Sequence, residues 1–136
     1  YKGNDVYATT KLFAAWWAAE LATRLPKGAT VNAVSPGATP DTDADRNGTW
    51  FLRRVMMPMF KFMPGMSHTI ADGAGRYLEA AGYSDDVTGK FFASPPKKMI
   101  GPLTEMNQPH LDNPAAQVAL WNVTNAVAGV AAPAAT

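Results

Sequence analysis

The sequence predicts an α/β fold in which helices alternate with two parallel strands. Three segments support this prediction: an alanine-rich helical stretch at 8–25, a β-rich run at 30–35 bounded by turn formers, and a second β-rich run at 88–94. Residues 38–86 separate the two β-rich runs and contain helical segments, which is the long crossover that a parallel pair of strands requires. The 136 residues have the length of one ordinary domain.

The helix at 8–25 is apolar almost all round in its first half. At roughly 100° per residue, its small side follows Tyr7 and Lys11 and carries Ala14, Ala15, Ala18 and Ala22. Its bulky side carries Phe13, Trp16 and Trp17. A helix with two apolar sides is expected to be buried on both. We therefore expect the alanine side to lie against the sheet and the aromatic side against another helix, either in this chain or in a second copy of a homo-oligomer.

Two further helices are expected within the crossover. The segment 50–57 reads as a short helix that ends at Pro58, and Ser67 is expected to cap a helix that continues to about Ala81. Gly82 is the stop signal of this second helix.

The last part of the chain reads as an irregular stretch, a helix and a tail. The stretch follows Pro95 and Pro96, and the helix is expected from 114 to 127. The tail 129–136 is rich in alanine, contains one proline and is expected to be disordered. The prediction is therefore that 1–128 belong to one domain, followed by a disordered tail.

The composition excludes several classes of function. A net charge of +1 gives no electrostatic basis for binding nucleic acid or an anionic membrane. The absence of cysteine excludes disulfides and thiolate metal sites and suits a reducing cytoplasm, where we expect the protein. His68 and His110 stand alone, so no metal site is predicted. The sequence contains no run of about 20 apolar residues, so no membrane span is predicted.

Tyr7 and Lys11 are the candidate catalytic residues. Their i, i+4 spacing places a phenol and an ammonium side by side on one helix face. A free tyrosine, with a pKa near ~10, transfers protons poorly at neutral pH, and a cation beside a phenol favours its ionised form. The pair is therefore a plausible acid–base device, although the Tyr-x-x-x-Lys spacing also arises by chance as an ordinary surface pair.

The order of motifs around this pair resembles the short-chain dehydrogenase/reductase family. Tyr7-x-x-x-Lys11 opens a helix that leads to the β-rich run at 30–35 and to the Pro36-Gly37 turn, and the run 87–92 is similar to the last sheet strand of the family. The resemblance covers about 4–94 and implies the C-terminal part of a Rossmann-type, doubly wound parallel sheet. Leu120-Trp121-Asn122-Val123-Thr124 is similar to the tail of members near the retinol-dehydrogenase type, a looser match.

The resemblance also implies the chemistry and the binding residues. It implies an enzyme that interconverts an alcohol and a carbonyl with NAD or NADP. Tyr7 would donate or accept the substrate proton, and Lys11 would assist it and hold the nicotinamide ribose hydroxyls. The turn residues Pro36, Gly37, Ala38 and Thr39 would meet the nicotinamide.

The methionine- and aromatic-rich segment 50–66 has two interpretations. It is either a packed helical hairpin or the substrate loop that the family places here, with an apolar small-molecule substrate in contact with Trp50, Met56, Met57 and Phe60.

Two motifs of the family are absent. The chain has no Gly-x-x-x-Gly-x-Gly loop, and only six residues precede Tyr7, fewer than separate the family's catalytic serine from its tyrosine. The expectation is a C-terminal fragment of a longer enzyme, inactive by itself. Two alternatives stay open: a non-catalytic family member that acts as an interaction module through its first helix, and a sugar-nucleotide epimerase or dehydratase that uses the same Tyr/Lys pair.

Overall fold

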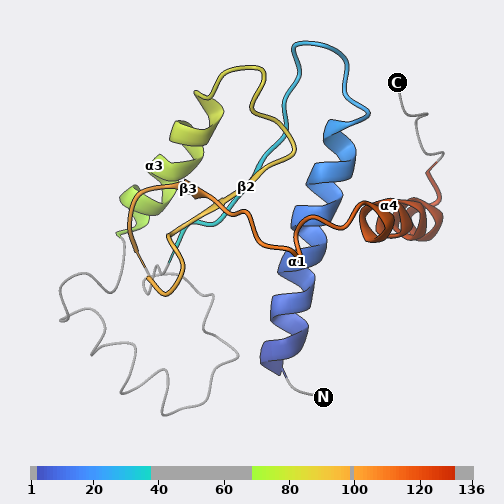
Figure 1. Cartoon of the computed structure of the whole chain (residues 1–136), viewed down its shortest axis with the longest axis horizontal. Helices are drawn as coiled ribbons and strands as arrows, with labels where there is room; N and C mark the ends of the chain where they lie inside the picture. The colour runs from blue at the N-terminus through green and yellow to red at the C-terminus, as the bar shows by residue number, and fades with distance from the viewer. Residues whose placement is uncertain (1–2, 38–68, 99, 131–136) are drawn as a thin grey trace. The chain divides into compact units, whose positions relative to one another are not determined.

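The computed structural model describes residues 3–37, 69–98 and 100–130. Within these residues the protein is a mixed α/β structure with helices α1, α3 and α4 and three short strands (Figure 1). The chain forms two compact units, which are described separately below. The first unit comprises Tyr1–Ala33, Tyr83–Phe91 and Glu105–Thr136, and the second comprises Val34–Gly82 and Phe92–Thr104.

Helix α1 of the first unit spans Gly3–Ala22, so it begins before the expected start at residue 8. It also ends earlier than expected. The Thr23 hydroxyl donates to the Glu20 carbonyl at 2.8 Å, and the Arg24 amide donates to the Leu21 carbonyl at 2.9 Å. These bonds satisfy terminal carbonyls of the helix in a tighter turn, which ends the α-helical ladder before Leu25.

The alanine side of α1 packs closely from Ala15 to Ala22, as its sequence predicts, whereas Ala14 is exposed. Ala15 and Ala18 are buried. A Cβ atom built on Gly89 would lie 3.0 Å from the Cβ of Ala22 and 3.6 Å from the Cα of Ala19. Gly89, which precedes the second strand, can therefore approach the helix this closely because it has no side chain.

The aromatic side of α1 packs against α4, which spans Pro114–Ala128 (Figure 1). The indole rings of Trp17 and Trp121 stack with their centroids 5.5 Å apart. The expected partner helix therefore lies in the same chain. The expectation of burial on both sides is wrong for the aromatic side, because α4 leaves Phe13 40% and Trp17 37% exposed. Asn113 caps α4 by accepting from the amide of Ala116, and Gly129 ends the helix at a φ of +65°.

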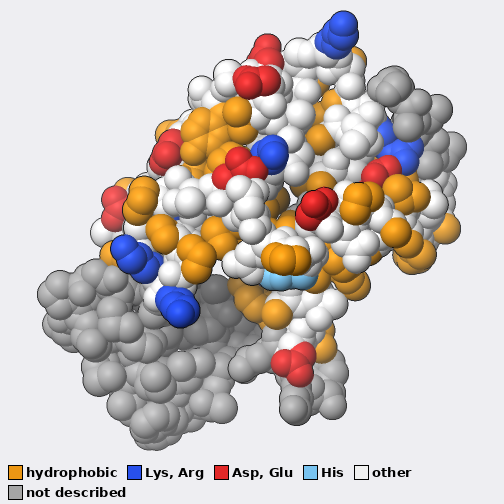
Figure 2. All heavy atoms as spheres, viewed as in Figure 1, with side chains coloured by type: hydrophobic (Ala, Val, Ile, Leu, Met, Phe, Trp, Pro, Cys, Tyr) orange, Lys and Arg blue, Asp and Glu red, His pale blue; other side chains and the backbone are white. Residues whose placement is uncertain are grey.

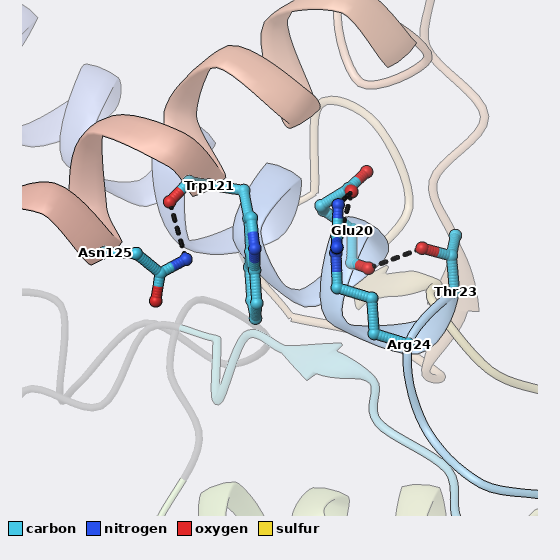
Figure 3. Close-up of polar contacts among 5 residues, drawn as sticks. All are labelled: Glu20, Thr23, Arg24, Trp121 and Asn125. Carbon is cyan, nitrogen blue, oxygen red and sulfur yellow. Dashed lines mark hydrogen bonds and ion pairs between the residues drawn. The ribbon is translucent and has the colours of Figure 1, made fainter. Parts of the chain in front are cut away.

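Trp121 is the most deeply buried aromatic residue among the described ones, with 3% of its surface exposed. Figure 3 shows its neighbours at the end of α1. The Cζ atom of Arg24 lies 5.0 Å from the indole centroid, and the Arg24 guanidinium forms an ion pair with Glu20 one turn earlier. The side-chain amide of Asn125 donates to the Trp121 carbonyl at 2.8 Å. An aromatic ring, a cation and a carboxylate thus hold the two helices together.

The strands are β1 (Ala33–Val34), β2 (Phe91–Ala93) and β3 (Thr104–Glu105), and they pair in the order β1-β2-β3. In the first unit, Gly89 donates to Val31 and Ala33 donates to Lys90. In the second, Ser35 donates to Phe92. Because the bonded residues advance together along both segments, β1 and β2 run parallel, as predicted. The prediction of only two strands is wrong, because β3 pairs with β2.

Both predicted strands are shorter than expected, because side chains replace part of the backbone ladder. The Asn32 side chain donates to the Val87 carbonyl at 2.7 Å and accepts from the Lys90 amide at 3.0 Å. The Thr88 hydroxyl accepts from the Val31 amide at 3.1 Å. Gly89 has a φ of +71°, which interrupts the extended backbone just before β2. Regular pairing therefore begins only after these residues.

Helix α3 of the second unit spans Ile70–Ala81. The expected cap at Ser67 is wrong, because Thr69 is the N-cap. Its hydroxyl accepts from the Asp72 amide and the Asp72 carboxylate accepts from the Thr69 amide, which is a capping box. Gly82 ends the helix as predicted. The buried face of α3 carries Gly73, Arg76 and Ala80.

The remaining predictions on the secondary structure concern residues outside the described ones. The short helix expected at 50–57 and the tail beyond Val130 belong to this group.

Candidate functional site

Tyr7 and Lys11 lie on one face of α1, as their spacing predicts. The Lys11 Nζ atom is 5.3 Å from the centroid of the Tyr7 ring. Because α1 begins at Gly3, Tyr7 lies one turn inside the helix, where its position is set by regular backbone geometry. The Tyr7 side chain is 64% exposed, and Lys11 is exposed as well. The pair therefore offers a phenol and an ammonium to a molecule outside the helix.

The hydroxyls that neighbour Tyr7 are used within the helix. Thr9 donates to the Asp5 carbonyl at 2.7 Å, and Thr10 donates to the Tyr7 carbonyl at 2.8 Å. Both bonds turn the threonine side chains back onto the preceding turn. Of the polar side chains at 7–11, those of Tyr7 and Lys11 are thus the ones that can contact a molecule outside α1.

Pro36 and Gly37 form the turn that follows β1 in the second unit. Gly37 has a φ of +79°, a conformation that residues with a side chain rarely adopt. Its amide donates to the Ser35 hydroxyl at 3.4 Å. Both turn residues are half-buried. The glycine is therefore required by the backbone, and the turn follows the carboxyl end of a parallel strand, where open α/β sheets bind ligands.

The predicted site residues fall into three groups. The structure brings Tyr7 together with Lys11 in the first unit and Pro36 together with Gly37 in the second. The remaining predicted residues lie outside the described ones: Ala38 and Thr39 of the cofactor turn, and Trp50, Met56, Met57 and Phe60 of the substrate segment.

Arg76 is a buried polar residue that the sequence analysis missed. It is 4% exposed and donates to oxygens of Ser35, Ser94 and Gly101. The available sequence signal was the spacing of Gly73, Arg76 and Ala80, which places the arginine on one helix face between two small residues. An arginine on such a face is positioned to enter the packed side of the helix.

The first unit also contains a cavity of about 650 Å³. Neither Tyr7 nor Lys11 lines it. Its wall includes the ion pair between Lys90 and Glu105, whose Nζ and Oε1 atoms are 3.0 Å apart. Asp112 is a further charged residue of the lining, and the others are small, apolar or amide-bearing and include Ala15, Ala19, Met106, Gln108, Leu111 and Gln117.

The described residues contain neither a candidate membrane-spanning helix nor a candidate metal cluster. No helix in this part of the chain combines the length and the apolar character needed to cross a membrane. No group of three or more His, Asp or Glu side chains in the same residues is placed to hold a metal ion. The backbone carbonyl of His110 accepts a hydrogen bond from Trp16 Nε1 at 2.9 Å.

One carboxyl group has a shifted pKa. The hydroxyl of Ser84 donates to Asp86, and together with the Asp86 backbone amide it holds the pKa of that carboxyl below its usual value of 3.8. Asp86 is exposed and lies in the turn before β2, so the shift reflects local hydrogen bonds and not burial.

Comparison with known proteins does not assign the chain to a family. No family model matches it, and no curated protein matches it.

Proposed function

We propose that this protein is an NAD(P)-dependent oxidoreductase of the short-chain dehydrogenase/reductase type, which interconverts an alcohol and a carbonyl. The observation that carries the proposal is the exposed Tyr7–Lys11 pair, with the ammonium 5.3 Å from the phenol ring. The parallel pairing of β1 with β2 and the left-handed turn at Gly37 support it, because both agree with the order of elements that the resemblance implies. On this proposal, β1 and β2 belong to a Rossmann-type sheet.

In the proposed reaction, Tyr7 handles the proton. During reduction the phenol gives its proton to the carbonyl oxygen of the substrate, and during oxidation the phenolate takes the proton from the alcohol. The nicotinamide of the bound cofactor supplies or accepts the hydride. Lys11 places a positive charge beside the phenol, which stabilises the phenolate present when the proton has left.

The exposed groups on α1 suit a nicotinamide ribose. The Lys11 ammonium has three N–H donors and lies at the surface, so it can bind two neighbouring hydroxyls while remaining close to the phenol. Taken by itself, the second unit offers the backbone at Gly37, after the carboxyl end of β1, as a contact for a nicotinamide carboxamide. No residue of this chain is assigned to the pyrophosphate, because the sequence contains no glycine-rich loop.

The proposal includes a cytoplasmic location, a small alcohol or carbonyl as substrate, and association into a homo-oligomer through α1. Although Trp17 stacks on Trp121 of α4, the three α1 residues Val6, Phe13 and Trp17 each keep about two fifths of their surface exposed within the first unit. Figure 2 also shows hydrophobic side chains gathered over α4, where Val118, Val123 and Val127 are exposed. Apolar surface of this kind on adjoining helices favours burial in an interface.

The test is hydride transfer by the protein expressed from the complete reading frame that contains these residues. NADH and NADPH carrying deuterium at C4 of the nicotinamide are incubated with a panel of aldehydes, ketones and sugar nucleotides, and the products are analysed by mass spectrometry. The proposal predicts deuterated alcohol and an equal amount of oxidised cofactor.

The other outcomes separate the alternatives. An isomerised sugar nucleotide without net oxidation of the cofactor would identify an epimerase, and loss of water without net oxidation would identify a dehydratase. A protein that binds neither NADH nor NADPH would refute the oxidoreductase and favour the interaction module.

A further inference from the structure

Arg76 of α3 is a buried cation in the second unit. Only 4% of its surface is exposed, and the small residues Gly73 and Ala80 lie on the same helix face, one turn before it and one turn after it. Small neighbours leave room for a guanidinium beside the helix. A buried charge is costly unless hydrogen bonds satisfy it, so the contacts of this group indicate what it does.

The guanidinium joins the ends of two strands and a loop. Nη1 donates to the Ser35 carbonyl at 2.9 Å, and Nη2 donates to the Ser94 hydroxyl at 3.0 Å. Nη2 also donates to the Gly101 carbonyl at 2.7 Å. Ser35 directly follows β1, which ends at Val34, and Ser94 directly follows β2, which ends at Ala93. Arg76 therefore holds the carboxyl ends of two neighbouring parallel strands.

These three acceptors are neutral oxygens, two of them backbone carbonyls. Hydrogen bonds from a charged donor are stronger than neutral ones, and the planar guanidinium fixes the directions of its N–H groups. An apolar residue could fill the same space without burying a charge. The distinctive property of Arg76 is thus the fixed geometry that it imposes on the three segments.

Ser35 is held by three separate hydrogen bonds. Its amide donates to the Phe92 carbonyl at 2.8 Å, its carbonyl accepts from Arg76, and its hydroxyl accepts from the Gly37 amide at 3.4 Å. The Pro36-Gly37 turn therefore starts from a residue whose backbone amide and carbonyl are both hydrogen-bonded. The bond to the carbonyl comes from Arg76, which lies outside the sheet.

We propose that Arg76 is the positioning residue of the Pro36-Gly37 turn, and that it sets the geometry in which this turn receives the nicotinamide. The inference rests on the function proposed above. Arg76 acts through Ser35 and does not contact the cofactor itself. Loss of the guanidinium should therefore loosen the turn and weaken cofactor binding.

The experiment compares Arg76→Met, Arg76→Lys and the control Leu78→Ala in the protein expressed from the complete reading frame. Leu78 lies on the same helix and is 77% exposed. For each protein, the KM for NADPH, the kcat and the hydrogen exchange of the Ser35 and Gly37 amides are measured. We expect Arg76→Met to raise the KM and the Gly37 exchange rate at least about tenfold with a smaller change in kcat. Arg76→Lys should recover part of each effect, and Leu78→Ala should leave all three unchanged.

A merely structural role predicts a different pattern. Arg76→Met would then lower the melting temperature, while the KM of the folded protein and the Gly37 exchange rate would equal those of the wild type; this result overturns the proposal. If Arg76→Met does not fold, Arg76→Lys decides, since wild-type KM and exchange in that variant would contradict the requirement for the planar donor. If the wild type binds neither NADH nor NADPH, the proposed function fails, and Gly37 exchange alone decides whether Arg76 positions the turn.

Discussion

The indole ring of Trp121 in α4 stacks on that of Trp17 in α1, with 5.5 Å between the ring centroids. The stacked pair joins the aromatic side of α1 to α4 and buries Trp121, while Trp17 itself stays 37% exposed. It also shows that the C-terminal helix is part of the fold of this unit.

Replacing Trp121 should therefore destabilise the protein strongly. Trp121→Ala removes the stacking on Trp17 and the cation–π contact with Arg24, and we expect a loss of about 3–5 kcal/mol in the free energy of unfolding. Trp121→Phe should lose less, about 1–2 kcal/mol, because it keeps a ring, and because no acceptor for the indole N–H is present among the described residues. Urea denaturation measures both. Val127→Ala, at a position that is 84% exposed, is the control and should be near neutral.

Gly89 and Gly28 form a matched pair for testing the close approach to α1. Both have a positive φ, of +71° and +84°, so alanine at either position should cost about 1–2 kcal/mol of backbone strain. Only at Gly89 would the new Cβ atom meet the helix, 3.0 Å from the Cβ of Ala22. We expect Gly89→Ala to lose about 1–3 kcal/mol more stability than Gly28→Ala. Equal losses in urea denaturation would show that the packing of Gly89 on α1 is not tight.

Lys11 should be needed for both cofactor binding and turnover. Lys11→Met removes the ammonium that lies over the Tyr7 ring, and we expect kcat/KM for the alcohol–carbonyl reaction to fall by about 10²-fold or more. Lys11→Arg keeps the charge and should retain part of the activity. The control is Lys27→Met, at an exposed position in the turn after α1. Steady-state kinetics in which Lys11→Met equals the control would remove Lys11 from the site.

The lowered pKa of Asp86 predicts that its contribution to the stability of the fold depends on pH in the acid range. Because the folded pKa lies below the unfolded value, the ionised carboxylate stabilises the fold at pH values above about 3.8. This contribution is lost as the pH falls through the lowered folded pKa. Ser84→Ala removes the main hydrogen bond and should raise the pKa of Asp86, whereas Ser84→Thr keeps the hydroxyl and should leave it low. Carbon-detected NMR titration of the Asp86 carboxyl group measures its pKa. An unchanged pKa in Ser84→Ala would show that the Ser84 hydroxyl is not the cause of the lowering.

Local signals in the sequence predicted the helices better than the strands. Pro114 at the start and Gly129 at the end bound α4 within one residue of the expected range, because capping depends on neighbouring residues. The predicted strands were too long because the side chains of Asn32 and Thr88 bond to backbone groups more than 50 residues away. The two-residue strand β3 exists only through its pairing with β2, so nothing local marks it.

The same distinction applies to the candidate site. Tyr7 and Lys11 were predictable because an i, i+4 spacing determines their proximity once the helix forms. The bend at Gly37 was predictable because a glycine after a proline is typical of a turn, and Gly37 has a φ of +79°. The bond from Arg76 to Ser35 joins residues 41 positions apart, and a single arginine in a helix does not indicate which carbonyl it will reach. Contacts that depend on how a helix packs on strand ends require the fold.

The most direct test of the central claim is the turnover of Tyr7→Phe against that of Tyr77→Phe. Both substitutions remove one phenolic hydroxyl from an exposed tyrosine on a helix, at 64% and 49% exposure. The oxidation of NADPH and NADH with a carbonyl substrate is followed in the protein expressed from the complete reading frame, together with cofactor binding. Proton transfer by Tyr7 predicts a kcat about 10²–10⁴-fold lower in Tyr7→Phe with cofactor binding retained, and wild-type turnover in Tyr77→Phe. Equal turnover in the two variants would contradict the account, because another residue would then handle the proton.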